Sequence, residues 1–152
     1  MNLIMGVDPG KTGAVAFLDE AGNLVHVEDM AQLTGAALGT WLVDLLDDLA
    51  PDRVVEAWVE DVHSMPKQGV RSVWTFAEGH GVILGALGAA RIRTELVTPA
   101  RWKKAAGLNK DKTASRLRAS TRWPDQARMF ARVKDDGRAE AALIALYGSG
   151  AS

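Results

Sequence analysis

Three acidic residues occupy positions where an ionised carboxylate is unfavourable unless something binds it. Asp8 ends the apolar run "LIMGVD", Glu60 ends "VVEAWVE", and Glu140 is enclosed by alanine and leucine in "RAEAALIAL". A carboxylate in apolar surroundings needs a cation or hydrogen-bond donors, and carboxylate oxygens suit Mg²⁺ or Mn²⁺. If the fold brings these acids together, they predict a divalent-metal site. Taken alone, Asp8 before Pro9-Gly10 is more simply explained as a turn residue.

The chemistry of such a centre is phosphodiester hydrolysis. Two ions about 3.5–4 Å apart can activate the attacking water and stabilise the leaving 3′ oxygen. The charge distribution favours a nucleic-acid substrate: residues 1–90 hold 4 Lys and Arg against 13 Asp and Glu, whereas residues 91–138 hold 14 against 5. Such asymmetry predicts a nucleic-acid-binding surface, although solvated basic helix faces would produce the same pattern.

The run Gly10-Lys11-Thr12 invites a different interpretation, a phosphate-binding loop. That loop requires G-x-x-x-x-G-K-[ST] between a strand and a helix. Its first glycine would have to be residue 5, which is methionine, and the following "GAVAF" is a strand pattern. We therefore expect no nucleotide cofactor.

The elements that position the acids follow from the hydrophobic periodicity. Strands are predicted at residues 2–8, 13–19, 24–30, 53–61 and 93–99. Helices are predicted at residues 35–49 (with Thr34 as N-cap), 70–91, 100–107, 110–121 and 137–148. This order predicts an α/β fold with a mixed five-stranded sheet, three strands antiparallel and then two parallel, with helices on both faces. The first and fourth strands would be adjacent, with Asp8 beside Glu60.

Length and composition are consistent with one domain spanning residues 1–152, in which 149–152 form a loose tail. The chain has no cysteine, which excludes disulfides and thiolate metal sites. No apolar run is long enough to span a bilayer, and the N-terminus lacks the features of a signal peptide. We expect a cytoplasmic protein that does not enter the membrane.

The motifs together resemble the RuvC-like Holliday junction resolvases of the RNase H-like (retroviral integrase) superfamily, particularly the short phage-type members. The resemblance covers nearly the whole chain. It is carried, in the family's order, by "MGVDPGKTG", "WVEDVHSMPKQG", "HGVILGALG", "VTPARWKKAAGL", "WPDQA" and "DDGRAEAALIALYG". It implies an RNase H-like fold and a homodimeric endonuclease that cuts four-way DNA junctions by paired, symmetrical nicks.

The resemblance assigns metal ligands to Asp8, Glu60 and Glu140. The family's fourth ligand usually lies three residues before the last acid, where this chain has Gly137. We place the fourth ligand at Asp136 instead, which is on the same helical face as Glu140, with Asp135 as the alternative. The implied cofactor is Mg²⁺, with Mn²⁺ as a substitute and two ions in each site. A solvated first turn of the helix would also explain the acids at 135 and 136.

The basic residues of the family bind the junction backbone. The positions that resemble them, with plausible neighbours, are Lys103, Lys104, Lys110, Lys112, Arg101, Arg116 and Arg118. In the loop at 62–69, His63 occupies the place where cellular members insert an aromatic side chain at the crossover, and Met65 is a candidate apolar wedge. An ordinary surface loop explains these two residues equally well.

Small residues recur along the predicted helix 70–91, at Ala77, Gly81, Gly85 and Gly88. Each glycine inside a helix costs about 1 kcal/mol relative to alanine, so close packing should compensate. Packing on the sheet is the simpler explanation. The resemblance adds a homodimer interface through this helix, which would present two acid sites to a two-fold junction.

Several alternatives remain open at this point. The same fold also fits an enzyme that acts on other branched DNA such as replication forks or on RNA, and a junction-binding protein with weak or no catalysis. An actin-like ATPase shares a similar first hairpin, but it needs two such domains to enclose ATP.

Overall fold

The computed structural model describes residues 2–51, 55–63, 66–109 and 112–151. A five-stranded sheet of order β3-β2-β1-β4-β5 lies at its centre. The strands are β1 (Leu3–Asp8), β2 (Ala14–Asp19), β3 (Leu24–Asp29), β4 (Val55–Glu60) and β5 (Arg93–Val97). Strands β1, β2 and β3 are antiparallel, and β4 and β5 run parallel to β1. The predicted sheet is confirmed.

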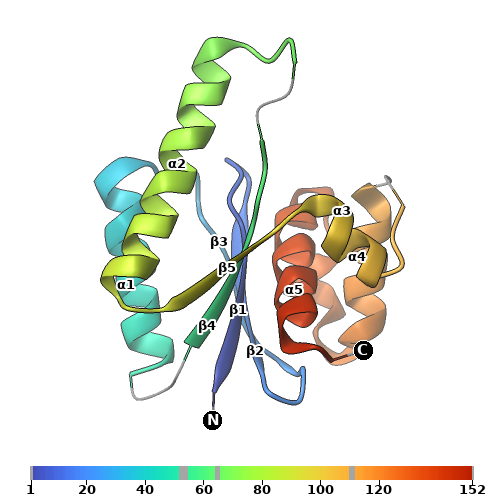
Figure 1. Cartoon of the computed structure of the whole chain (residues 1–152). Helices are drawn as coiled ribbons and strands as arrows, with labels where there is room; N and C mark the ends of the chain where they lie inside the picture. The colour runs from blue at the N-terminus through green and yellow to red at the C-terminus, as the bar shows by residue number, and fades with distance from the viewer. Residues whose placement is uncertain (1, 52–54, 64–65, 110–111, 152) are drawn as a thin grey trace.

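Helices cover both faces of the sheet (Figure 1). On one face lie α1 (Gly35–Leu49) and α2 (Val70–Ala89), and on the other lie α3 (Pro99–Ala105), α4 (Lys112–Arg122) and α5 (Asp136–Ser149). Each helix begins and ends within a few residues of its predicted bounds. Thr34 occupies the N-cap position of α1, but its side chain makes no capping hydrogen bond. Two short 3₁₀ segments that the apolar pattern did not predict, η1 (Pro124–Phe130) and η2 (Val133–Asp135), connect α4 to α5.

The two layers have separate hydrophobic cores because the strands are buried on both sides. Met5, Val7 and Phe17 point towards α1 and α2, whereas Ala16 and Leu18 point towards α5. This is the alternation expected of a strand that points successive side chains to opposite faces. Helix α5 is buried along most of its length, which fits its composition of alanine and leucine.

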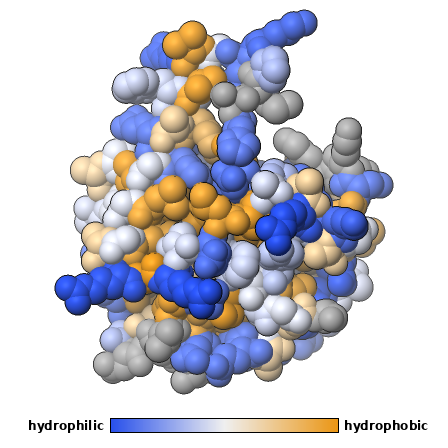
Figure 2. All heavy atoms as spheres, in the orientation of Figure 1, coloured by the Kyte–Doolittle hydropathy of each residue, from blue (hydrophilic) through white to orange (hydrophobic). Residues whose placement is uncertain are grey.

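The ends of β1 and β4 lie beneath a projecting helix. The N-terminal part of α2 extends past the sheet, so that the strand ends lie below it (Figure 1). Figure 2 shows hydrophobic side chains gathered over the middle of this face of the molecule, flanked by hydrophilic groups. Within the described residues, the structure contains no helix that is both apolar enough and long enough to cross a bilayer.

Candidate metal centre

Three carboxylates meet where β1, β4 and α5 come together. One ligand oxygen from each of Asp8, Glu60 and Glu140 lies within 4.8 Å of the other two. Glu60 is buried, with 6% of its surface exposed, and the other two are partly buried. The structure therefore brings together the three acids that come from distant parts of the sequence. Their oxygen donors and spacing fit a divalent cation.

The geometry follows from the packing of two strands and one helix. Strands β1 and β4 are parallel neighbours, so their carboxyl ends place Asp8 and Glu60 at one edge of the sheet. Helix α5 contacts β1 at Gly6, where an added Cβ would collide with the backbone carbonyl of Ala141. A side chain at position 6 would push the helix away. The absence of one lets α5 approach closely enough to place Glu140 beside Asp8.

Burial, together with the neighbouring negative charges at Asp8, raises the affinity of the centre for protons. Burial, followed by the neighbouring charges of Glu140 and Glu60, raises the pKa of Asp8 to about 7. Burial also raises the pKa of Glu60. A carboxylate that holds a proton near neutral pH is one whose negative charge is insufficiently compensated, and a cation would supply that compensation.

Helix α3 supplies two contacts to the acids from consecutive residues. The indole Nε1 of Trp102, which is fully buried, donates a hydrogen bond to Glu60 Oε1 at 3.0 Å. The Nζ of Lys103 lies 3.8 Å from Glu140 Oε1 and 5.2 Å from the centre of the Trp102 ring. The Lys103 charge lowers the pKa of both Asp8 and Glu60, against the larger effect of burial. A further contact comes from the first hairpin, where Gly10 N donates to Asp8 Oδ1 at 3.2 Å.

The predicted fourth ligand is not part of this group. Asp136 Oδ1 accepts a hydrogen bond from Arg116 Nε at 2.7 Å, and Asp136 does not belong to the set of mutually close carboxylates found among the described residues. The alternative, Asp135, is fully buried and is held by the Arg132 side chain at 2.8 Å. Burial acts to raise the pKa of Asp135, but the hydrogen bonds and charges of Arg132 and Arg138 outweigh it and lower the pKa overall. Both acids are engaged with arginines.

Gly137, where the resemblance led us to look for the fourth ligand, faces the backbone of the first hairpin. A Cβ at this position would collide with the carbonyl oxygen of Thr12. The hairpin turn therefore occupies the space that a ligand side chain at 137 would need. Arg138, the next residue, forms a bidentate ion pair with Asp29 at the end of β3, at 2.9 and 2.7 Å. These contacts hold the start of α5 against the hairpin.

The predicted DNA-contacting cations fall into different environments. Arg101 and Lys104 are exposed on α3, and Lys103 lies at the metal centre. Arg116 is paired with Asp136, and Arg118 donates to the carbonyl of Ala106 at 3.3 Å. Lys112 begins α4, whereas Lys110 lies outside the described residues. Of these predicted cations, among those that the structure describes, Lys103 is the one whose charged group lies within 4 Å of a carboxylate of the metal centre.

The loop after β4 is only partly described. His63 is 81% exposed in its side chain, and its Nε2 lies 3.4 Å from Asp61 Oδ2. Met65 lies outside the described residues. The role of both residues at a junction remains a prediction.

The small-residue stripe of α2 does not pack on the sheet. A Cβ added at Gly81, Gly85 or Gly88 would meet no atom within 4 Å. The simpler of the two explanations, packing against the sheet, is therefore wrong for these glycines. The buried face of the helix is formed by Ile83 and Leu87 instead. The stripe is open to solvent in the single chain.

The fold and the site together define an RNase H-like α/β domain with an acidic centre at the ends of its first and fourth strands. No protein-family model and no curated protein sequence matches this chain. Solved structures do: RuvC of Thermus thermophilus in complex with a Holliday junction substrate superposes with a TM-score of 0.69 at 16% sequence identity, covering 95% of this chain and 90% of RuvC.

A second structure of Thermus thermophilus RuvC has a TM-score of 0.67 at 15% identity and covers 97% of this chain and 96% of that one. Structural similarity at such low sequence identity is evidence for the fold alone. As a statement about the fold, the predicted resemblance to RuvC is confirmed.

The sequence motifs indicated the three acids but not their support. Trp102, Asp29 and Arg138 were not predicted, although Trp102 lies next to a predicted lysine inside the motif "VTPARWKKAAGL". A buried indole in a short basic helix was the available signal, because tryptophan N–H groups usually find a partner when they are buried.

Proposed function

We propose that this chain is a divalent-metal-dependent, structure-selective endonuclease that resolves four-way DNA junctions by paired hydrolysis of phosphodiester bonds. The observation that supports it is the meeting of Asp8, Glu60 and Glu140 within 4.8 Å. The fold that positions them is similar to that of RuvC, whose solved complex contains a Holliday junction.

Asp8, Glu60 and Glu140 would hold the metal. Three carboxylates, with one ammonium group within 4 Å of them among the described residues, are a donor set for Mg²⁺ or Mn²⁺, and two ions in each site are the arrangement we propose. The metal supplies Lewis-acid activation of water and charge stabilisation at the leaving oxygen. Asp136 stays outside this set in our proposal because its carboxylate is bound by Arg116.

The protein's own groups orient the acids. Trp102 holds one oxygen of Glu60 by its indole N–H, which restricts the rotation of that carboxylate. Gly10 does the same for Asp8 through its backbone N–H. Lys103 is placed to compensate negative charge at Glu140 and, when DNA is bound, to contact a phosphate near the scissile bond. Lys104 and Arg101 on the same helix extend this cationic surface.

Symmetrical cleavage requires two such centres. We propose that the chain forms a homodimer through α2, whose open stripe of Gly81, Gly85 and Gly88 would let a second helix approach closely. A two-fold dimer presents the same site to two strands of a two-fold junction.

The test is cleavage of an end-labelled synthetic four-way junction, with linear duplex, a three-way fork and a structured RNA of equal length beside it. Reactions contain Mg²⁺ or Mn²⁺ and compare wild type with Asp8→Asn. Paired nicks on the four-way junction, absent on duplex and lost in the variant, are expected. Preferred cleavage of the fork or the RNA would show that the enzyme selects that nucleic acid and not the four-way junction. Tight junction binding without cleavage in either metal would refute the nuclease and leave a junction-binding protein.

A further inference from the structure

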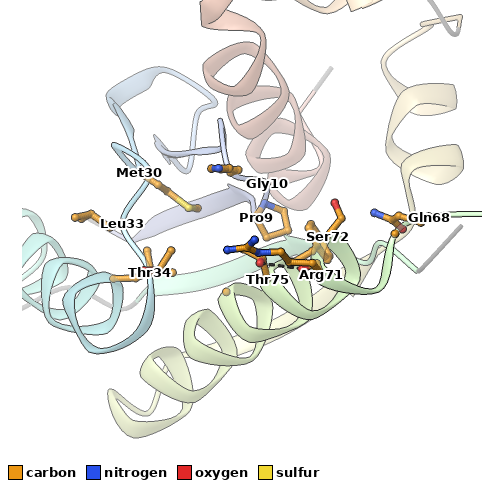
Figure 3. A pocket seen from close by; sticks show the side chains of 14 residues that line it. Pro9, Gly10, Met30, Leu33, Thr34, Gln68, Arg71, Ser72 and Thr75 are labelled. Atoms are coloured by element: carbon orange, nitrogen blue, oxygen red, sulfur yellow. Dashed lines mark hydrogen bonds between the residues drawn. The ribbon is translucent and has the colours of Figure 1, made fainter.

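A cavity of about 530 Å³ lies beneath the projecting part of α2, on the face of the sheet opposite to α5. Figure 3 shows its three walls: Arg71, Ser72 and Thr75 come from α2, Met30, Leu33 and Thr34 from the connection between β3 and α1, and Pro9 and Gly10 from the first hairpin. None of these residues belongs to the carboxylate group.

The lining of the cavity divides into an apolar floor and a polar, cationic rim. Met30 and Leu38 are almost fully buried and form the floor with Leu33, and Phe76, whose ring stacks on His80 with one of its two faces, adds an aromatic side chain. Lys11 and Arg71 are both exposed at the rim, and neither forms an ion pair with any described residue. The volume lies in the range that encloses a small organic ligand. A ligand that matches this lining has a flat, largely apolar body and a negative charge attached to it.

The cavity is connected to the metal centre by the chain itself. Pro9 and Gly10, which form one wall, directly follow Asp8, and Gly10 N donates the hydrogen bond that orients the Asp8 carboxylate. A DNA phosphate held at the carboxylates would therefore lie next to the segment that forms this wall of the cavity. The nucleotides next to that phosphate are the nearest ligands of the required chemistry.

We propose that this cavity binds one unpaired nucleotide of the DNA substrate, with its base between Phe76 and Leu33 and its phosphates on Lys11 and Arg71. The inference rests on the proposed function and adds a determinant of substrate choice. A base in continuous duplex is stacked on both sides and cannot enter a cavity of this size without being extruded, whereas an unpaired base at a branch point is free to do so. Stacking on an aromatic side chain accepts any base.

The probe is a short single-stranded thymidine oligonucleotide that carries one 2-aminopurine, because this probe requires no junction recognition. Its fluorescence is titrated with metal-free wild-type protein and with Lys11→Met, Arg71→Met and Thr75→Trp. Thr75 is exposed on α2, so the tryptophan fills the cavity without disturbing the core. Val70→Trp is the matched control, because Val70 is 87% exposed on the same helix end and does not line the cavity.

We expect the 2-aminopurine signal to change on binding and to be lost in Thr75→Trp but kept in Val70→Trp. Each loss of a rim cation should weaken binding about fivefold and reduce the dependence of log K on log salt by about 0.7. Equal binding by wild type and Thr75→Trp overturns the inference, even if the junction is cleaved normally. So does a change of sedimentation in Thr75→Trp alone, since the cavity would then be a contact between two copies of the chain.

Failure of the proposed function gives a different result. Junctions would then remain uncut by wild type, whatever the oligonucleotide does in the cavity. The two readouts use different substrates and can therefore be assigned separately.

Discussion

Trp102 Nε1 donates a 3.0 Å hydrogen bond to Glu60 Oε1 across 42 positions of the sequence. The next residue, Lys103, places its ammonium group 3.8 Å from Glu140. One turn of α3 thus contacts two acids that come from a strand and from the last helix. The short basic helix is part of the metal centre as well as of the cationic surface, and this relationship can be tested by substitution.

Trp102→Phe should keep most of the buried ring and remove the hydrogen bond. Glu60 would then lose the donor that orients it, and loss of such an outer contact typically lowers metal affinity 10–100-fold. We expect Mn²⁺ binding, measured by calorimetry without DNA, to weaken by about tenfold. Trp74→Phe is the control, because Trp74 is 74% exposed on α2. Unchanged Mn²⁺ affinity in Trp102→Phe would show that the hydrogen bond does not position Glu60 for metal binding.

Lys103→Met should increase the affinity for Mn²⁺ while weakening the binding of junction DNA. The ammonium group opposes a second cation at Glu140, and a partly exposed charge interaction of this kind is worth about threefold to fivefold. Lys104→Met, one residue further along α3 and exposed, should weaken DNA binding alone. Weaker Mn²⁺ binding in Lys103→Met would contradict the arrangement, since the lysine would then support the metal instead of competing with it.

Asp8 should make the stability of the metal-free protein depend on pH. Its pKa is about 7 in the folded chain and near 3.8 in the unfolded one, so the folded state binds more protons between these values. Stability therefore falls as the pH rises from about 4 to about 7, by up to about 4 kcal/mol. Thermal unfolding in a chelator across this range measures the effect. Asp8→Asn should flatten the curve and raise the melting temperature at pH 7.5. A wild-type stability that rises with pH over this range would contradict the raised pKa of Asp8.

The same proton should compete with the metal. Because Asp8 must be ionised to bind a cation, Mn²⁺ affinity should fall by up to about tenfold for each pH unit below about 7. Calorimetry in two buffers of different ionisation enthalpy would detect the proton released on binding near pH 6.5. Binding that releases no proton would show that Asp8 is already ionised in the metal-free protein.

Gly137→Asp should fail to restore a fourth ligand. A side chain at 137 would collide with the Thr12 carbonyl, so we expect a loss of stability of several kcal/mol and no gain in Mn²⁺ affinity. Asp136→Asn should cost less stability, because it breaks an ion pair with Arg116 at the helix start, and should leave Mn²⁺ affinity within about twofold. A tenfold loss of affinity in Asp136→Asn would restore that residue to the ligand set.

Most of the fold could be predicted because its information is local. Short apolar runs define β1 and β2, alternation defines β3, and helical periodicity defines α1 and α5, so the bounds agree within a few residues. The 3₁₀ segments η1 and η2 escaped prediction because three to seven residues carry no clear period. Sheet packing, the simpler of the two explanations for the glycine stripe of α2, failed for a related reason: one helix face looks the same in sequence whether it packs on a sheet or faces solvent.

In the candidate site, too, local sequence predicts some features and only the tertiary packing decides the others. Asp8, Glu60 and Glu140 could be identified because an acid at an apolar strand end or within an apolar helix is unusual in the sequence itself. Their distances, the raised pKa of Asp8 and the hydrogen bond from Trp102 depend on how α5 and α3 approach the sheet. The ion pair of Asp136 with Arg116 depends in the same way on how α4 packs against α5. Residue type limits which groups can do the chemistry, but contacts between distant segments decide which of them meet, because those contacts arise only when the helices pack.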